Sequence, residues 1–157
     1  MEIKGDELDG ILITHEHSDH IKGLGVFSRK YEIPIYATPG TIAGIKESSS
    51  LGKMPEGLLH PIKADHPFQL GELDVHPFAI SHDANEPSGY RIEQGGKSVA
   101  VATDLGKYDD YTVKNLKNLD AILLEANHDI HMLEVGGYPY YFCLLYTSDA
   151  ADDLIGV

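Results

Sequence analysis

The distribution of apolar and polar positions along the chain predicts an alternation of strands and helices. A short apolar run over 10–14 ends in a polar loop, which is typical of a buried strand. Apolar residues then recur at helical spacing from Ile21 to Tyr31, and an acidic residue in the first turn favours a helix that begins near Asp19. The pattern next predicts a strand over 33–37, a helix over 42–46 and an exposed loop over 48–52.

The middle of the chain has the pattern of two β-hairpins. Their turns contain glycine, Gly71 in the first and Gly95-Gly96 in the second. The predicted elements are strands over 68–70 and 73–80, strands over 90–93 and 98–102, a short helix over 111–119 and a buried strand over 120–125. Strands, helices and hairpins in this mixture indicate a layered fold of the α/β or α+β class.

Composition adds limits to this pattern. The 157 residues suffice for one domain with a sizeable core, and the single Cys excludes a disulfide framework. Since no apolar run approaches the roughly 20 residues of a membrane helix, we expect no membrane partner. The net charge of −13 argues against a broad, non-specific contact with nucleic acid. It leaves room for a local metal site that binds a phosphate.

Histidine is abundant, and its densest group directly follows the first predicted strand. Residues 14–20 read Thr-His-Glu-His-Ser-Asp-His, and imidazole and carboxylate are ligands that zinc and similar ions prefer. Alternate residues of an extended backbone project to the same side, so His15 and His17 could hold one ion. Asp19 and His20, beyond the bend, could hold a second. The alternative is a solvated His-rich turn, but so dense a cluster after a buried strand favours metal binding.

This segment resembles the His-x-His-x-Asp-His signature of the metallo-β-lactamase fold superfamily. There, a third His follows a central hairpin and a bridging Asp follows the next hairpin, and His82 and Asp104 stand at those places. The resemblance therefore implies two ligand sets, His15, His17 and His82 for one ion, and Asp19, His20 and Asp104 for the other. A surface loop His remains an alternative for His82. A helix N-cap before Leu105 remains one for Asp104, and both roles could hold together.

The likeness is closer still to the YycJ/WalJ-type metallo-hydrolases of bacteria. It is carried by 14–23, 81–84, 102–106 and 124–129, and it covers roughly residues 7–141. The resemblance implies the four-layer αββα metallo-β-lactamase fold, a cytoplasmic location and two divalent ions, zinc or alternatively manganese. It also implies a phosphodiesterase or exonuclease that acts on nucleic acid. A dinuclear site activates a bridging hydroxide by lowering the pKa of water to ~7.

Two residues are predicted to act in catalysis. Asp19 could orient or deprotonate the water, and His128 could protonate the leaving oxygen. A loop His that is hydrogen-bonded to backbone explains His128 equally well. Glu125 could orient a His ligand, or it could be a cap or a solvated side chain. We interpret the other histidines as structural or surface residues, namely His60, His66, His76 and His131.

Both ends of the chain depart from the family pattern, so we expect a fold that is incomplete at both ends. His15 comes almost at once, whereas the family has N-terminal strands before the motif. The late His ligand of the second metal is expected beyond residue 141, and no His follows His131. Residues 143–157 resemble a translated sequencing adapter, with a genuine helix over 149–154 as the alternative. We therefore predict a partial domain over 1–142 and a non-native tail over 143–157.

Three functions remain open from the sequence. The first is a dinuclear metal hydrolase acting on phosphodiesters, for which the 157-residue chain itself is expected to be inactive. The second is a thioester or lactone hydrolase of the same fold, which would cleave acyl substrates without a response to DNA. The third is a non-catalytic metal-binding regulatory protein, which would retain metal without turnover. The sequence determines neither the exact substrate nor the oligomeric state.

Overall fold

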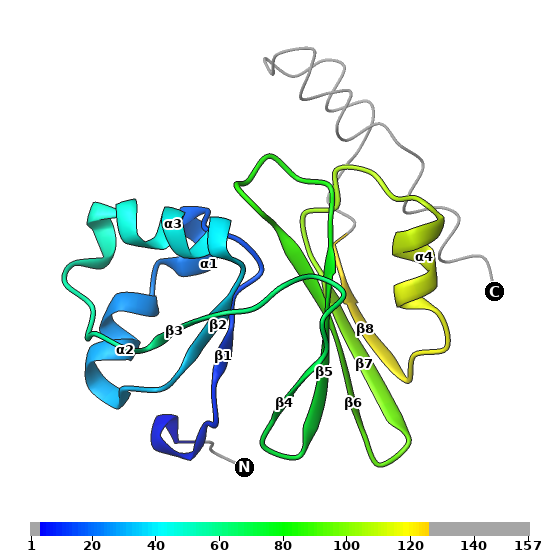
Figure 1. Cartoon of the computed structure of the whole chain (residues 1–157), viewed down its shortest axis with the longest axis horizontal. Coiled ribbons are helices and arrows are strands. Elements are labelled where there is room, and N and C mark those ends of the chain that lie inside the picture. The colour runs from blue at the N-terminus through cyan, green and yellow to red at the C-terminus, as the bar shows by residue number, and fades with distance from the viewer. Residues whose placement is uncertain (1–3, 126–157) are drawn as a thin grey trace.

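A computed structural model describes residues 4–125, which form two β-sheets (Figure 1). The first sheet is parallel, in the order β1 (Ile11–Leu12), β2 (Ile35–Ala37) and β3 (Leu59–Pro61). The second follows the order of the chain, with β4 (Phe68–Leu70), β5 (Leu73–Ala79), β6 (Ser88–Gln94), β7 (Lys97–Ala102) and β8 (Ala121–Leu124). Its strands are antiparallel except that β8 is parallel to β7.

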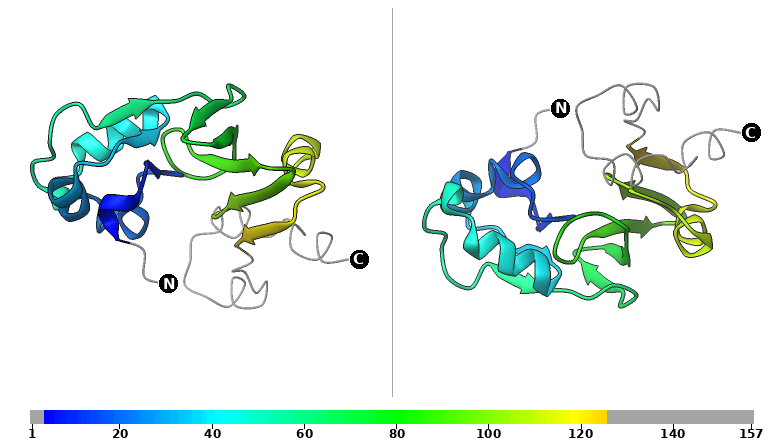
Figure 2. Two further views of the ribbon diagram at one scale, coloured as in Figure 1. Left: turned by 90° about the horizontal axis from the view of Figure 1, so that it is seen from below. Right: turned by 90° about the horizontal axis from the view of Figure 1, so that it is seen from above.

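Helices lie outside the two sheets. The elements α1 (Ser18–Ile21), α2 (Leu24–Tyr31) and α3 (Pro39–Glu47) lie beside the first sheet, and α4 (Asp110–Leu116) lies beside the second. Two short 3₁₀ turns, η1 (Gly5–Glu7) and η2 (Ser49–Leu51), complete the elements. Figure 2 shows the helices of the two groups on opposite sides of the paired sheets. The predicted αββα layer order is confirmed.

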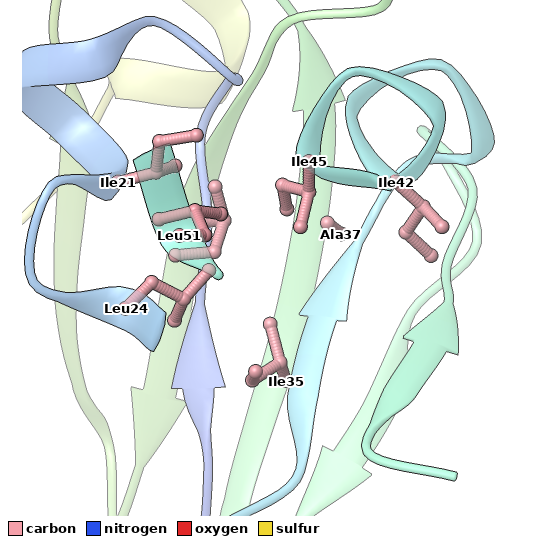
Figure 3. Packing of buried hydrophobic residues seen from close by; sticks show 8 residues of the cluster. Ile21, Leu24, Ile35, Ala37, Ile42, Ile45 and Leu51 are labelled. Carbon is pink, nitrogen blue, oxygen red and sulfur yellow. The ribbon is translucent and has the colours of Figure 1, made fainter. Parts of the chain in front are cut away.

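Each sheet has an apolar core beneath its helices. The first core consists of Ile13, Ile21, Leu24, Ile35, Ala37, Ile42, Ile45 and Leu51 (Figure 3). On β2 the buried Ile35 and Ala37 belong to this core. The side chain between them, Tyr36, stacks on Phe68 of β4 with ring centroids 5.3 Å apart. The second core consists of Phe78, Ile80, Ala100, Ala102 and Leu116.

The sheets are joined by aromatic side chains. The stack of Tyr36 on Phe68 is one link, and the buried Tyr90 of β6 is another. The hydroxyl of Tyr90 donates a hydrogen bond of 2.6 Å to the carbonyl of Ile13, directly after β1. Because an unpaired buried carbonyl is costly, this bond fixes the end of β1 against β6.

Several predicted elements differ from the structure. The helix expected from Asp19 is divided into α1 and α2. The last helix, α4, ends at Leu116 because the next residue, Lys117, has an extended backbone with φ −77° and ψ 149°. The prediction of an exposed loop over 48–52 is wrong at Leu51. This residue is 3% exposed, because η2 places its side chain in the first core. The three-residue strand β3 was not predicted.

The prediction that the strand over 120–125 is buried is also wrong. Ile122 is 43% exposed and Leu123 is 61% exposed, because β8 is the edge strand of the second sheet within residues 4–125. No helix in the same range is long and apolar enough to cross a membrane. The predicted tail over 143–157 lies outside the described residues, and the division of the chain at residue 142 stays a prediction.

Candidate metal centre

Three loops that are far apart in the sequence meet at one end of the paired sheets. They follow β1, β5 and β7, and backbone hydrogen bonds tie them together. The amide of Ser88 donates to the carbonyl of Thr14 at 2.9 Å, and the amide of Gly106 donates to the carbonyl of Ser81 at 2.7 Å. These bonds bring the segment 14–20 next to the residues that follow the two hairpins.

The first group of candidate ligands consists of His15, His17 and His82. One ring nitrogen from each lies within 4.8 Å of the others. Nε2 of His82 is 3.1 Å from Nδ1 of His17, and the ring centroid of His15 is 4.6 Å from that of each partner. The structure thus brings together the three histidines that the sequence assigns to one ion. With its side chain 6% exposed, His82 is not a surface residue, so that alternative is wrong.

The second group consists of His15, His20 and Asp104, which again lie within 4.8 Å of one another. Oδ2 of Asp104 is 2.9 Å from Nε2 of His20 and 3.8 Å from Nε2 of His15. Because His15 belongs to both groups, the five side chains form one cluster rather than two separate sites. The helix-cap alternative for Asp104 is wrong, since the next helix begins at Asp110 and Asp109 caps it.

Burial keeps the central imidazole of this cluster neutral. His15 is fully buried, and this burial, followed by the nearby imidazoles, lowers the pKa of His15 to about 4. Burial also lowers the pKa of His82, against an opposing effect of Asp104. Neutral imidazole is the form that binds metal. The alternative of a solvated His-rich turn is therefore wrong for His15.

The donor set suits a divalent ion. Nε2 of His15 is buried and has no hydrogen-bond partner among residues 4–125. Leaving such a polar atom unpaired is costly, and an ion between the converging nitrogens and the carboxylate of Asp104 would satisfy it. Imidazoles with one carboxylate are also the ligand types found at zinc sites. The residues thus fit the metal that the sequence motif predicts.

Two of these candidate ligands are oriented by Thr14. Its Oγ1 is 3.2 Å from Nδ1 of His15 and 3.5 Å from Nδ1 of His20, which leaves Nε2 of both rings turned toward Asp104. The sequence analysis did not single out Thr14, although it directly precedes the first His.

Glu125 acts on the cluster from the end of β8. Its Oε2 accepts a 2.9 Å hydrogen bond from the backbone amide of Asp104, which has a left-handed backbone with φ 55°. Such a backbone is uncommon outside glycine and persists where its surroundings hold it. Glu125 therefore contacts the backbone of a candidate carboxylate ligand, and its predicted role in orienting a His ligand stays a prediction.

The remaining predicted residues lie outside the two groups. The side chain of Asp19 is 78% exposed, and its Oδ2 is 3.6 Å from Nε2 of His20. Its roles as ligand and as catalytic residue stay predictions, and His128 lies outside the described residues. The exposed His60 stacks on Tyr36, and Nδ1 of His66 is 2.9 Å from a backbone carbonyl. His76 lies half-buried on β5, and His131 is also outside the described residues.

Comparisons with known proteins agree with this geometry. A family model described as a beta-lactamase superfamily domain matches residues 2–136. Exodeoxyribonuclease WalJ of Streptococcus pneumoniae is 40% identical over 137 residues, which are 87% of this chain and 51% of that protein. Exodeoxyribonuclease YycJ of Bacillus anthracis is 37% identical over 139 residues, which are 88% of this chain and 52% of that protein. The chain thus spans about half the length of these relatives.

A solved structure shares the fold. Zn²⁺-bound PqqB from Methylobacterium extorquens superposes with a TM-score of 0.69, over 83% of this chain and 50% of that one. At 22% sequence identity, this likeness concerns the fold alone.

Proposed function

Because the chain belongs to the metallo-β-lactamase superfamily, we propose that it is a metal-dependent hydrolase that cleaves phosphodiester bonds of DNA. The observation that carries the proposal is the convergence of four imidazoles and one carboxylate from three loops into one cluster. The identity of 40% to a relative named as an exodeoxyribonuclease supports DNA as the substrate. The same comparison favours a nuclease over the thioester and lactone hydrolases that the sequence left open.

The proposed ligands fall into two sets, and a ring nitrogen of His15 lies within 4.8 Å of ligand atoms from both. His15, His17 and His82 would hold one divalent ion, and His20, Asp104 and Asp19 would contribute to a second. Zinc is the first candidate, with manganese as the alternative. When bound, such ions would act as Lewis acids toward the phosphodiester and lower the pKa of an attacking water.

The chain's own residues prepare the site for this chemistry. His15 is neutral at physiological pH, so no proton has to leave it before metal binds. Oγ1 of Thr14 orients two of the rings through Nδ1. Asp19 is exposed beside His20, where its carboxylate could accept a proton from water. His128 is the proposed proton donor to the leaving oxygen.

DNA binding would depend on this site rather than on a basic surface. The net charge of −13 gives the chain no general attraction for a polyanion. Bound cations would supply the local positive charge that a phosphate requires. We therefore expect hydrolysis to depend on occupied metal sites more steeply than on ionic strength.

Hydrolysis assays test the proposal. The full-length protein should hydrolyse bis(p-nitrophenyl) phosphate and DNA ends, and a chelator should abolish both activities. His17→Ala should remove the activity, and His60→Ala is a matched control because His60 lies outside both ligand groups. Hydrolysis of thioesters or lactones alone would contradict the proposal. Bound metal without any turnover would favour a regulatory protein.

A further inference from the structure

Glu16 stands between two candidate ligands, His15 and His17, but its side chain leaves the cluster. It lies against α3 at Gly44, where an added Cβ would be 2.3 Å from Cγ of Glu16 and 2.8 Å from its Cβ. A Cβ atom essentially never makes nonbonded contacts this short, so the missing side chain of Gly44 provides the space in which Glu16 lies. The alternation of an extended backbone explains why Glu16 points away from its neighbours.

The carboxylate of Glu16 reaches the loop that carries His82. Its Oε1 accepts a 2.7 Å hydrogen bond from the backbone amide of Asn85. A bond to an ionised acceptor is roughly twice as strong as a neutral one. Oε2 is also buried and has no hydrogen-bond partner among residues 4–125. Glu16 thus links the first ligand loop to the third residue after His82.

The same loop is attached to α3 by other bonds. Oε2 of Glu86 accepts from the amide of Gly40 at 2.7 Å, and the carbonyl of Glu86 accepts from the hydroxyl of Thr38 at 2.6 Å. On the other side, the carbonyl of Ser81 accepts from Gly106 at 2.7 Å. Because these anchors do not involve Glu16, its removal should loosen the stretch between Ser81 and Glu86 without unfolding the loop.

We propose that Glu16 is a positioning residue. It holds the His82 ring next to that of His17, with Nε2 of His82 3.1 Å from Nδ1 of His17. It acts through Asn85 and touches neither His82 nor an ion. The inference rests on the proposed metal binding, and it adds a residue to which neither the motif nor the ligand geometry assigns a role. Side chains that support metal ligands typically change metal affinity by about 10–100-fold when they are removed.

Four variants of the 157-residue chain separate this positioning role from a general effect of charge or of folding. Glu16→Ala removes the link, and Glu16→Gln keeps an oxygen acceptor at the same place. Gly44→Ala removes no polar group and favours the helix, but its Cβ would displace Glu16. Glu47→Gln changes the charge by the same amount at an exposed end of α3, so it is the control.

Two readouts are measured. The first is Zn²⁺ affinity by competition with a chromophoric chelator, and the second is hydrogen exchange of the Asn85 amide in the metal-free chain. We expect Glu16→Ala to lower Zn²⁺ affinity by about 10–100-fold and to speed Asn85 exchange. Gly44→Ala should act in the same direction, Glu16→Gln should stay within a few-fold of wild type, and Glu47→Gln should change neither readout.

Unchanged Asn85 exchange in Glu16→Ala would overturn the inference, and so would faster exchange with unchanged Zn²⁺ affinity. If Glu16→Ala fails to fold, Gly44→Ala decides the question by the same two readouts. Wild-type chain that binds no Zn²⁺ would contradict the proposed function and the ligand-positioning role, while Asn85 exchange would still report whether the link exists.

Discussion

The two sheets of the protein contribute to the candidate site in different ways. The first sheet has short parallel strands of two or three residues, and the helices beside it share one enclosed core. It provides the His-rich segment 14–20 directly after β1. In the second sheet the strands β5 to β8 have four to seven residues, and α4 is the helix that lies beside it within residues 4–125. This sheet provides His82 and Asp104 from loops.

The sheets also differ in how well they cover apolar side chains. Ile35 in the first sheet is fully buried, whereas Val99, Ile122 and Leu123 in the second are between 39% and 61% exposed. The candidate ligands therefore come from two unequal supports, namely the first sheet with its enclosed core and the second sheet with its partly exposed strands. A metal ion that binds ligands from both sheets should therefore hold the second sheet against the first and raise the free energy of unfolding.

Substitutions in the two sheets should have the most unequal effects on stability. Ile35→Ala removes a fully buried side chain and should lower the free energy of unfolding by about 2–5 kcal/mol. Leu123→Ala, on the exposed edge strand, should change it by less than about 0.5 kcal/mol. Chemical denaturation of both variants checks this, and equal losses would mean that β8 is covered in solution.

Acid should weaken the metal-free chain through its buried imidazole. The unfolded chain protonates His15 near the ordinary histidine pKa of 6.5, whereas in the folded chain burial lowers the pKa of His15 to about 4. The contribution of the buried, neutral His15 to the free energy of unfolding is therefore fully present above pH 6.5. It is lost as the pH falls toward 4, by up to about 3 kcal/mol. Denaturation at a series of pH values should show this loss, and His15→Asn should flatten it. A profile that is flat between pH 7 and 5 would contradict the buried, neutral His15.

Tyr90→Phe should show how strongly the two sheets are joined. The change removes the hydroxyl that donates to the Ile13 carbonyl and leaves that acceptor without this bond. The expected loss is about 1–3 kcal/mol of unfolding free energy. Tyr36→Phe is a matched control, because it keeps the ring that stacks on Phe68. Equal, small losses in both variants would show that the hydrogen bond contributes little.

Glu125→Gln should have a smaller effect that is confined to the second ligand group. The amide retains an oxygen that can accept from the backbone of Asp104, but it loses the negative charge. We expect about a few-fold lower affinity for the second ion and unchanged affinity for the first. Metal titration followed by calorimetry separates the two events, and an equal loss at both would refute this division.

Much of the fold could be predicted because its signals are local. The hairpins were evident from alternation and from turn glycines, and Gly95 and Gly96 adopt the positive φ values that their turn requires. Leu51 and β3 could not be predicted. A 3₁₀ turn that buries one Leu has no periodic pattern, and a three-residue strand ending in Pro61 has almost none.

The candidate site was predictable to the extent that its ligands lie in a motif. His15, His17 and His20 stand in one short segment, and the family resemblance pointed to His82 and Asp104. The link from Glu16 to Asn85 was not predictable, because it depends on a glycine in α3 and on a loop far along the chain. Whether these side chains bind metal stays a prediction of both the sequence and the geometry.

Metal content tests the central claim most directly. Elemental analysis of the purified 157-residue chain should find bound zinc or manganese, and His15→Ala should lose it from both ligand groups because His15 belongs to each. His17→Ala should lose metal from the first group only, and His60→Ala should bind as much as wild type. Unchanged metal content in His15→Ala would contradict the claim that loops from both sheets form one metal centre.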